Sequence, residues 1–72
     1  MNPRRLGNRL KVARAERNLS QLALARLAGV TRQSISSIET GEYCPSAFLA
    51  FLLAKRLEKR VDEVFFLEGD NP

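Results

Sequence analysis

The sequence contains no histidine and a single cysteine, Cys44, among its 72 residues. A zinc site of the histidine–cysteine type is therefore excluded, as are imidazole-based catalysis and a disulfide within the chain. The sequence also has no paired nucleophile and general base and no glycine-rich phosphate loop, so we expect neither an enzyme nor a cofactor nor a metal site. Cys44 on its own is expected to be a tolerated small residue.

Long hydrophobic runs are also missing. The longest apolar stretch, residues 47–54, is far too short to cross a bilayer, and the sequence does not open with a signal-peptide pattern. Binding to a membrane surface is disfavoured because the first basic segment lacks the large aromatic residues that such binding prefers. We therefore expect a soluble, cytoplasmic protein with no membrane partner.

With only three prolines and four glycines, the chain has no linker, repeat or low-complexity tract. We interpret residues 1–72 as one domain with a core over about residues 5–67. A core this thin gives marginal stability, and dimerisation is the usual support where disulfides and metals are absent.

Positive charge is unevenly distributed along the chain. The net charge is +4, but residues 1–32 hold eight arginines and lysines against one acidic residue, Glu16. Residues 33–72 hold four basic and seven acidic residues. A basic half suits contact with phosphates, although a solvated charged helix alone would account for it equally well. The motif of residues 19–41 favours nucleic acid as the binding partner of this basic half.

Residues 19–41 carry two short helical patterns joined by a tight turn. Ser20 and Thr31 are suited to cap the two helix starts, and Gly29 supplies the positive φ of a sharp helix exit. These signals predict helices over residues 21–28 and 32–40, arranged as a helix-turn-helix. The second helix has a polar outer face, which suits the major groove of DNA.

The remaining apolar spacing predicts an all-α bundle of five helices. The other helices are expected over residues 4–17, 47–58 and 61–65, and the first should bury a stripe of Leu6, Leu10 and Ala13. No segment shows the alternation of a real sheet, although residues 65–68 could end as a brief strand.

The ordered set of motifs resembles the Xre/Cro group of helix-turn-helix regulators, and especially its small stand-alone members. The motifs are Asn8-Arg9-Leu10-Lys11, Leu19-Ser20-Gln21, Gly29-Val30-Thr31-Arg32-Gln33, Ile38-Glu39, Tyr43-Cys44-Pro45-Ser46 and Val61-Asp62-Glu63-Val64-Phe65. No single motif is specific, but their order is, and it covers about residues 5–67. The resemblance implies a lambda-repressor-like bundle that binds a specific DNA sequence.

The resemblance also implies roles for individual residues. Four residues of the second motif helix are expected to contact base edges: Arg32, Gln33, Ser36 and Ser37. Residues expected to contact phosphates are Gln21, Thr31, Thr40, Tyr43 and Ser46. Arg14 and Glu39 match a pair that forms a partly buried salt bridge, with a structural role.

Three features depart from the family pattern. Thr40 stands where asparagine is common, and Glu42 stands where lysine is frequent, so its carboxylate would repel a nearby phosphate unless it points away. Residues 58–60 replace the usual turn, which carries a glycine and a serine or threonine cap, between the last two helices. The sequence therefore does not determine at which residue the helix predicted over residues 47–58 ends.

Several apolar residues fall outside the predicted core and suggest a symmetric homodimer. On a helical wheel Phe48, Phe51 and Leu52 lie away from the buried arc, and we expect Phe51 to pack under a neighbouring helix. The interface is expected mainly in residues 61–67, with a contribution from the preceding helix. The expected interface residues are Phe48, Leu52, Val61, Phe65, Phe66 and Leu67.

We therefore expect a transcriptional regulator that binds double-stranded DNA, a repressor acting as a homodimer on an inverted repeat, without a small-molecule ligand. The alternative is an antitoxin-like or co-activator-like module of the same fold that works through a protein partner. An enzyme is the weakest alternative, because the acidic residues near the end of the chain are expected to be solvated charges. These residues are Asp62, Glu63, Glu68 and Asp70.

Overall fold

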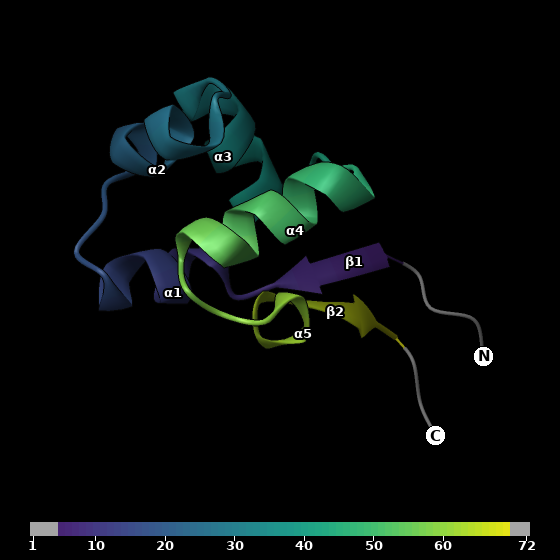
Figure 1. Cartoon of the computed structure of the whole chain (residues 1–72). Coiled ribbons are helices and arrows are strands. Elements are labelled where there is room, and N and C mark those ends of the chain that lie inside the picture. The colour runs from purple at the N-terminus through teal and green to yellow at the C-terminus, as the bar shows by residue number, and fades with distance from the viewer. Residues whose placement is uncertain (1–4, 70–72) are drawn as a thin grey trace.

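The computed structural model describes residues 5–69, which form five helices and a two-stranded sheet. Residue 4, the first of the helix predicted over residues 4–17, and Asp70 lie outside the described range. The elements in chain order are β1 (Arg5–Asn8), α1 (Leu10–Glu16), α2 (Gln21–Ala28), α3 (Arg32–Thr40), α4 (Ala47–Arg56), α5 (Val61–Val64) and β2 (Phe65–Glu68). Helices α1 and α5 lie beside the sheet, and α2, α3 and α4 lie over this layer (Figure 1). The five-helix bundle expected from the sequence is confirmed. Within the described range, no helix combines the length and apolarity that crossing a membrane requires.

Helices α2 and α3 begin and end at the predicted residues. The Ser20 hydroxyl accepts from the Ala23 backbone N–H at 3.0 Å, and the Thr31 hydroxyl accepts from the Ser34 N–H at 3.1 Å. Each helix ends at a glycine in the left-handed region, Gly29 at φ +71° and Gly41 at φ +84°. The motif is therefore defined by local capping at all four helix ends.

The expectation of a helix over residues 4–17 is wrong in its first part, and so is the expectation of no real sheet. Residues Arg5–Asn8 form β1, which pairs antiparallel with β2, and α1 begins only at Leu10. The side-chain oxygen of Asn8, the last residue of β1, accepts from the Leu10 N–H at 3.0 Å and so satisfies a backbone donor at the first residue of α1. Pairing with a distant segment therefore overrides the local helical spacing.

The ladder depends on a close approach at Gly7. Gly7 is paired with Phe66, and a Cβ added at Gly7 would clash with the Phe66 ring. The Arg9 guanidinium lies over the same ring, 4.7 Å from the ring centroid. The brief strand anticipated at residues 65–68 is confirmed, and its partner is the segment that sequence spacing assigned to a helix.

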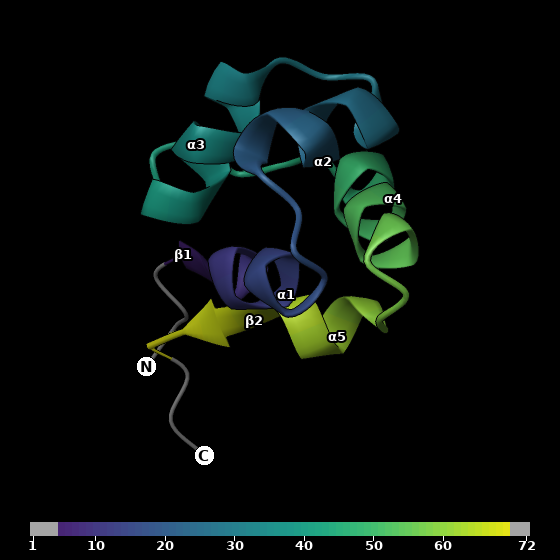
Figure 2. The same ribbon diagram turned by 90° about the vertical axis from the view of Figure 1, so that its left-hand side faces the viewer.

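The core lies between the α2–α3 layer and the layer of α1, α5 and the sheet, with α4 along one side (Figure 2). Its large, fully buried side chains are Leu10, Leu24, Ile35, Ile38, Leu53, Leu57 and Val64. The buried arc predicted for α4 is confirmed, because Leu49, Ala50, Leu53, Ala54 and Leu57 are all buried. Leu6 belongs to β1 but still packs against the core.

The turn between α4 and α5 forms without a glycine. Helix α4 ends at Arg56, two residues before the predicted end, and Glu58 takes the left-handed conformation at φ +57°. Helix α5 ends at Val64, and its start is supported by Glu63, whose carboxylate accepts from the Arg60 backbone N–H at 2.7 Å. A strained residue therefore takes the place of the glycine that such a turn prefers.

Candidate nucleic-acid interface

Helix α3 lies with α2 at one end of the molecule, apart from the sheet and α5 (Figure 1). Ile35 and Ile38 anchor one side of α3 in the core. Of the four residues expected to contact bases, Arg32 and Gln33 are exposed, whereas Ser36 and Ser37 are half-buried. The structure therefore brings all four onto one helix, with the two long side chains the more accessible.

A network of side chains from three helices supports the start of α3. Arg14 of α1 donates from Nε to Glu39 Oε2 at 2.8 Å, and both side chains are largely buried, with 15% and 7% exposed. Gln21 of α2 donates from Nε2 to the other oxygen of Glu39 at 3.0 Å. Arg32 then donates from a terminal nitrogen to Gln21 Oε1 at 3.0 Å. The expected ion pair is present, and it continues to the surface of α3.

The other residues expected at phosphates lie at the two ends of α3. Thr31 is exposed at its start, and Thr40, Tyr43 and Ser46 are exposed at and beyond its end. Glu42, which was expected to disturb a phosphate, lies with its carboxylate 3.1 Å from the Thr40 hydroxyl. The Thr40 hydroxyl is therefore engaged within the chain, like that of Ser46, which caps α4.

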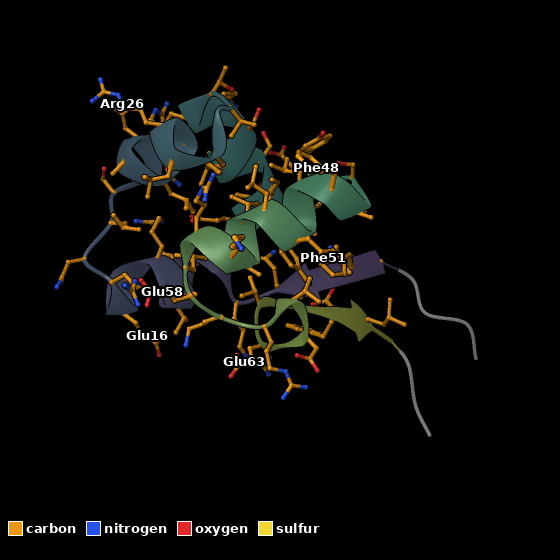
Figure 3. All side chains as sticks on the ribbon, in the orientation of Figure 1. Glu16, Arg26, Phe48, Phe51, Glu58 and Glu63 are labelled. Atoms are coloured by element: carbon orange, nitrogen blue, oxygen red, sulfur yellow. The ribbon has the colours of Figure 1, made fainter. Side chains whose placement is uncertain are left out.

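Three of the seven arginines and lysines at positions 5–32 pair with carboxylates. Arg5 pairs with Glu68, Arg17 pairs with Glu58 at 2.6 Å, and Arg14 pairs with Glu39 as described. Among residues 5–69, Arg26 and Arg32 on the α2–α3 unit form no ion pair. Figure 3 shows Arg26 projecting outward from α2. The number of basic residues in the first half of the sequence is therefore larger than the number of cations outside ion pairs. Two of the cations outside the ion pairs of the described residues, Arg26 and Arg32, lie on α2 and α3.

The apolar surface differs from the expected one. Phe51, expected inside, is 62% exposed, and Phe48 is 77% exposed. Both lie on α4, on the side away from Arg26 (Figure 3). Phe65, expected at an interface, is only 6% exposed because it closes the core beside Val64. Phe51 is thus exposed and Phe65 is buried, the reverse of what the sequence predicted for these two residues.

The exposed phenylalanines border an apolar groove of about 510 Å³ between α4 and α5. Leu52 and Val61, both half-buried, line it, and basic side chains of Lys55, Lys59 and Arg60 form part of its wall. Leu67 is exposed on β2, away from this groove, and Phe66 is covered by the Arg9 guanidinium. We call this surface of residues 48–61 the α4–α5 groove.

Comparison with known proteins identifies the class of the chain. The helix-turn-helix family model HTH_3 matches residues 10–64. An HTH-type transcriptional regulator from Methanocaldococcus jannaschii is 46% identical over 63 residues, covering 88% of this chain and 96% of the relative. The HTH-type transcriptional regulator YgzD from Bacillus subtilis is 41% identical over 64 residues, covering 89% and 97% of the two chains.

Solved structures give the same result. The restriction-modification controller protein C.AhdI from Aeromonas hydrophila superposes with a TM-score of 0.73 at 33% identity, covering 76% of this chain and 80% of that one. The crystal structure of a protein from Bacteroides fragilis superposes with a TM-score of 0.78, covering 85% of this chain and 98% of that one, and at 24% identity it supports the fold alone. The chain therefore belongs to the HTH_3 family, of the Xre type, and is a transcriptional regulator with a helix-turn-helix DNA-binding domain.

Proposed function

We propose that the protein is a repressor that binds an inverted-repeat operator as a homodimer and acts by occupying DNA, without catalysis or a cofactor. The observation that carries the proposal is the exposed polar face of α3, held in place by buried isoleucines and by the side-chain network of Glu39. A helix presented in this way enters the major groove and reads base edges.

Each outward residue of α3 has a chemistry that suits readout. Arg32 is suited to donate two hydrogen bonds to guanine N7 and O6, and Gln33 to pair with adenine N6 and N7. Ser36 and Ser37 are short and half-buried, so their contribution is through water or by leaving room. The base-reading surface is therefore narrow in one copy of the chain.

Phosphate contacts would position this surface without specifying sequence. We assign them to the N-terminal ends of α2 and α3, where helix N-termini favour anions, and to polar residues at and beyond the end of α3. The residues are Gln21, Thr31, Thr40, Tyr43 and Ser46. Arg26, exposed and outside any ion pair of the described residues, adds a cation on the same layer.

The homodimer is supported by the α4–α5 groove. Protruding rings and a hollow lie side by side on this surface, since Phe48 and Phe51 border the groove that Leu52 and Val61 line. A two-fold axis places the same surface of both copies in contact, so the rings of one copy can fill the groove of the other. No residue of α3 lines the groove, so both recognition helices stay free.

A dimer also supplies what a single copy lacks. Two recognition helices separated by one DNA turn, roughly 34–36 Å, read the two halves of an inverted repeat. Occupancy of such an operator near a promoter would block transcription.

A second candidate function uses the same groove differently. The basic side chains in its wall, Lys55, Lys59 and Arg60, would suit an acidic protein partner, as in an antitoxin-like or co-activator-like module. The two functions differ in what fills the groove, a second copy or another protein.

Selection of bound fragments from random duplex DNA at two salt concentrations tests the proposal. We expect an enriched inverted repeat with half-sites about one helical turn apart. Binding that enriches no motif and disappears at the higher salt would reflect phosphate attraction alone and would overturn it. Sedimentation of the free protein, giving monomer at every concentration, would direct the search to a protein partner.

A further inference from the structure

The contacts of Gln21 suggest a role beyond phosphate binding. Its side-chain amide lies between two charged groups of opposite sign, the nearly buried carboxylate of Glu39 and the exposed guanidinium of Arg32. The two contacts involve opposite ends of the amide, so the orientation of that amide determines whether both can form.

The orientation is set from the interior. An ionised carboxylate only accepts hydrogen bonds, so the Gln21 NH₂ group must face Glu39. Glu39 itself is held by Arg14, which donates to both carboxylate oxygens at 2.8 and 3.4 Å and also to the Leu19 carbonyl at 2.9 Å. The Gln21 oxygen therefore points away from Glu39, and in the structure it accepts from a donor at the start of α3.

Arg32 is that donor. It occupies the first position of α3, and one of its terminal N–H groups binds Gln21 Oε1 at 3.0 Å. A guanidinium has five N–H donors, so four remain for a base. An exposed arginine otherwise samples many rotamers, and ordering it beforehand lowers the entropy cost of binding.

We propose that Glu39 and Gln21 are positioning residues that hold the Arg32 guanidinium ready for base readout, so that sequence discrimination at one base pair depends on a buried carboxylate. This inference rests on the proposed function, in which Arg32 reads a base. The second N–H of Gln21 stays free for a phosphate, so both roles of this residue are compatible.

The first test uses Gln21→Met, which keeps the length of the side chain and removes both hydrogen bonds. Binding is measured at one salt concentration to the selected operator, to single base-pair variants of it and to unrelated duplex DNA. We expect about a tenfold loss of discrimination at the base pair whose discrimination Arg32→Ala also removes, because a good bidentate pair contributes on this scale. In the Arg32→Ala background, Gln21→Met should remove no further discrimination.

An equal loss of affinity for every duplex in Gln21→Met would overturn the inference and leave Gln21 as a phosphate contact alone. Failure of the proposed function has a different signature, since wild-type protein would then prefer no sequence, or Arg32→Ala would leave all preferences unchanged.

The second test separates positioning from stability. Glu39→Gln keeps the shape of the side chain but no longer dictates which end of the Gln21 amide faces it. Arg14→Lys is the matched control, since it weakens the same ion pair but leaves the Glu39 carboxylate to accept from Gln21. Both variants should be less stable, and well below their melting temperatures only Glu39→Gln should lose discrimination at the Arg32 base pair. Equal discrimination losses in the two variants would make the network structural only.

Discussion

The two sides of this molecule are built from different interactions. On the α2–α3 layer, side-chain hydrogen bonds connect Arg14, Glu39, Gln21 and Arg32 into one continuous network. Along the α4–α5 groove, the surface is apolar, and Phe48 and Phe51 stand largely in solvent. Directional bonds hold groups in set places, whereas apolar contacts tolerate adjustment. The first surface suits a ligand whose donors and acceptors lie in a defined pattern, and the second suits a protein surface that fits by shape.

The largest effect should come from breaking the network at its buried end. Glu39→Ala leaves the Arg14 guanidinium largely buried without its carboxylate, and we expect a loss of about 3–5 kcal/mol in the free energy of unfolding. Urea denaturation measures it. The matched control is Arg17→Met, which removes the exposed pair with Glu58 and should cost at most about 1 kcal/mol. Similar losses in both variants would contradict the special position of the buried pair.

On the apolar side, Phe51→Glu should weaken the proposed dimer with little effect on folding. The ring is 62% exposed in the single chain, so its loss costs the fold little, while a carboxylate in the groove opposes association. A hot-spot effect of about 2 kcal/mol or more would raise the dimer dissociation constant roughly 30-fold. Analytical ultracentrifugation measures it, with Val12→Glu as a control at an apolar residue that is 56% exposed on α1. Unchanged dimers would place the interface elsewhere.

The outer end of the polar side is tested by Gln33→Ala, which should lower discrimination at one adenine-containing base pair by about 1–3 kcal/mol. Arg26→Ala serves as the contrast, because a phosphate contact should weaken all duplexes alike and reduce the salt dependence of binding. Titration of operator variants by fluorescence anisotropy distinguishes the two patterns. Unchanged sequence preference in Gln33→Ala would remove this residue from the readout surface.

The smallest effect is expected at the turn after α4. Glu58→Gly relieves a left-handed residue at φ +57° but also gives up the exposed ion pair with Arg17. Because the two contributions partly cancel, we expect a gain of at most about 1 kcal/mol in thermal unfolding measurements. In an Arg17→Met background the ion pair is already absent, so the gain should be larger. A loss of stability in that background would show that the residue is not strained.

The sequence predicted the structure where local interactions decide it. The ends of α2 and α3 follow from capping residues such as Ser20, Thr31 and Gly29, each acting within one turn of its own helix. The spacing of Leu6, Leu10 and Ala13 fits one continuous helix as well as it fits the observed strand followed by α1, so β1 was mispredicted as helix. Its strand conformation depends on pairing with residues 65–68, and no local signal in residues 5–8 announces that partner.

The candidate site shows the same division. The four residues of α3 could be placed on one face from their spacing, and the resemblance supplied the Arg14–Glu39 pair. The link from Glu39 through Gln21 to Arg32 could not be predicted, because it requires three helices in their final positions. The exchange of Phe51 and Phe65 has the same cause, since the packing of α5 against α4 decides which ring is enclosed.

The pairing of β1 with β2 has a consequence for synthesis on the ribosome. Arg5 leaves the exit tunnel 63 positions ahead of its partner Glu68. The capping contacts of α2 and α3 are local and available while the chain is still growing, but β1 has no partner until residues 65–68 have emerged. A nascent chain would thus carry β1 as an unpaired strand until that point. The fold can therefore be completed only after the residues of β2 have been translated and have emerged.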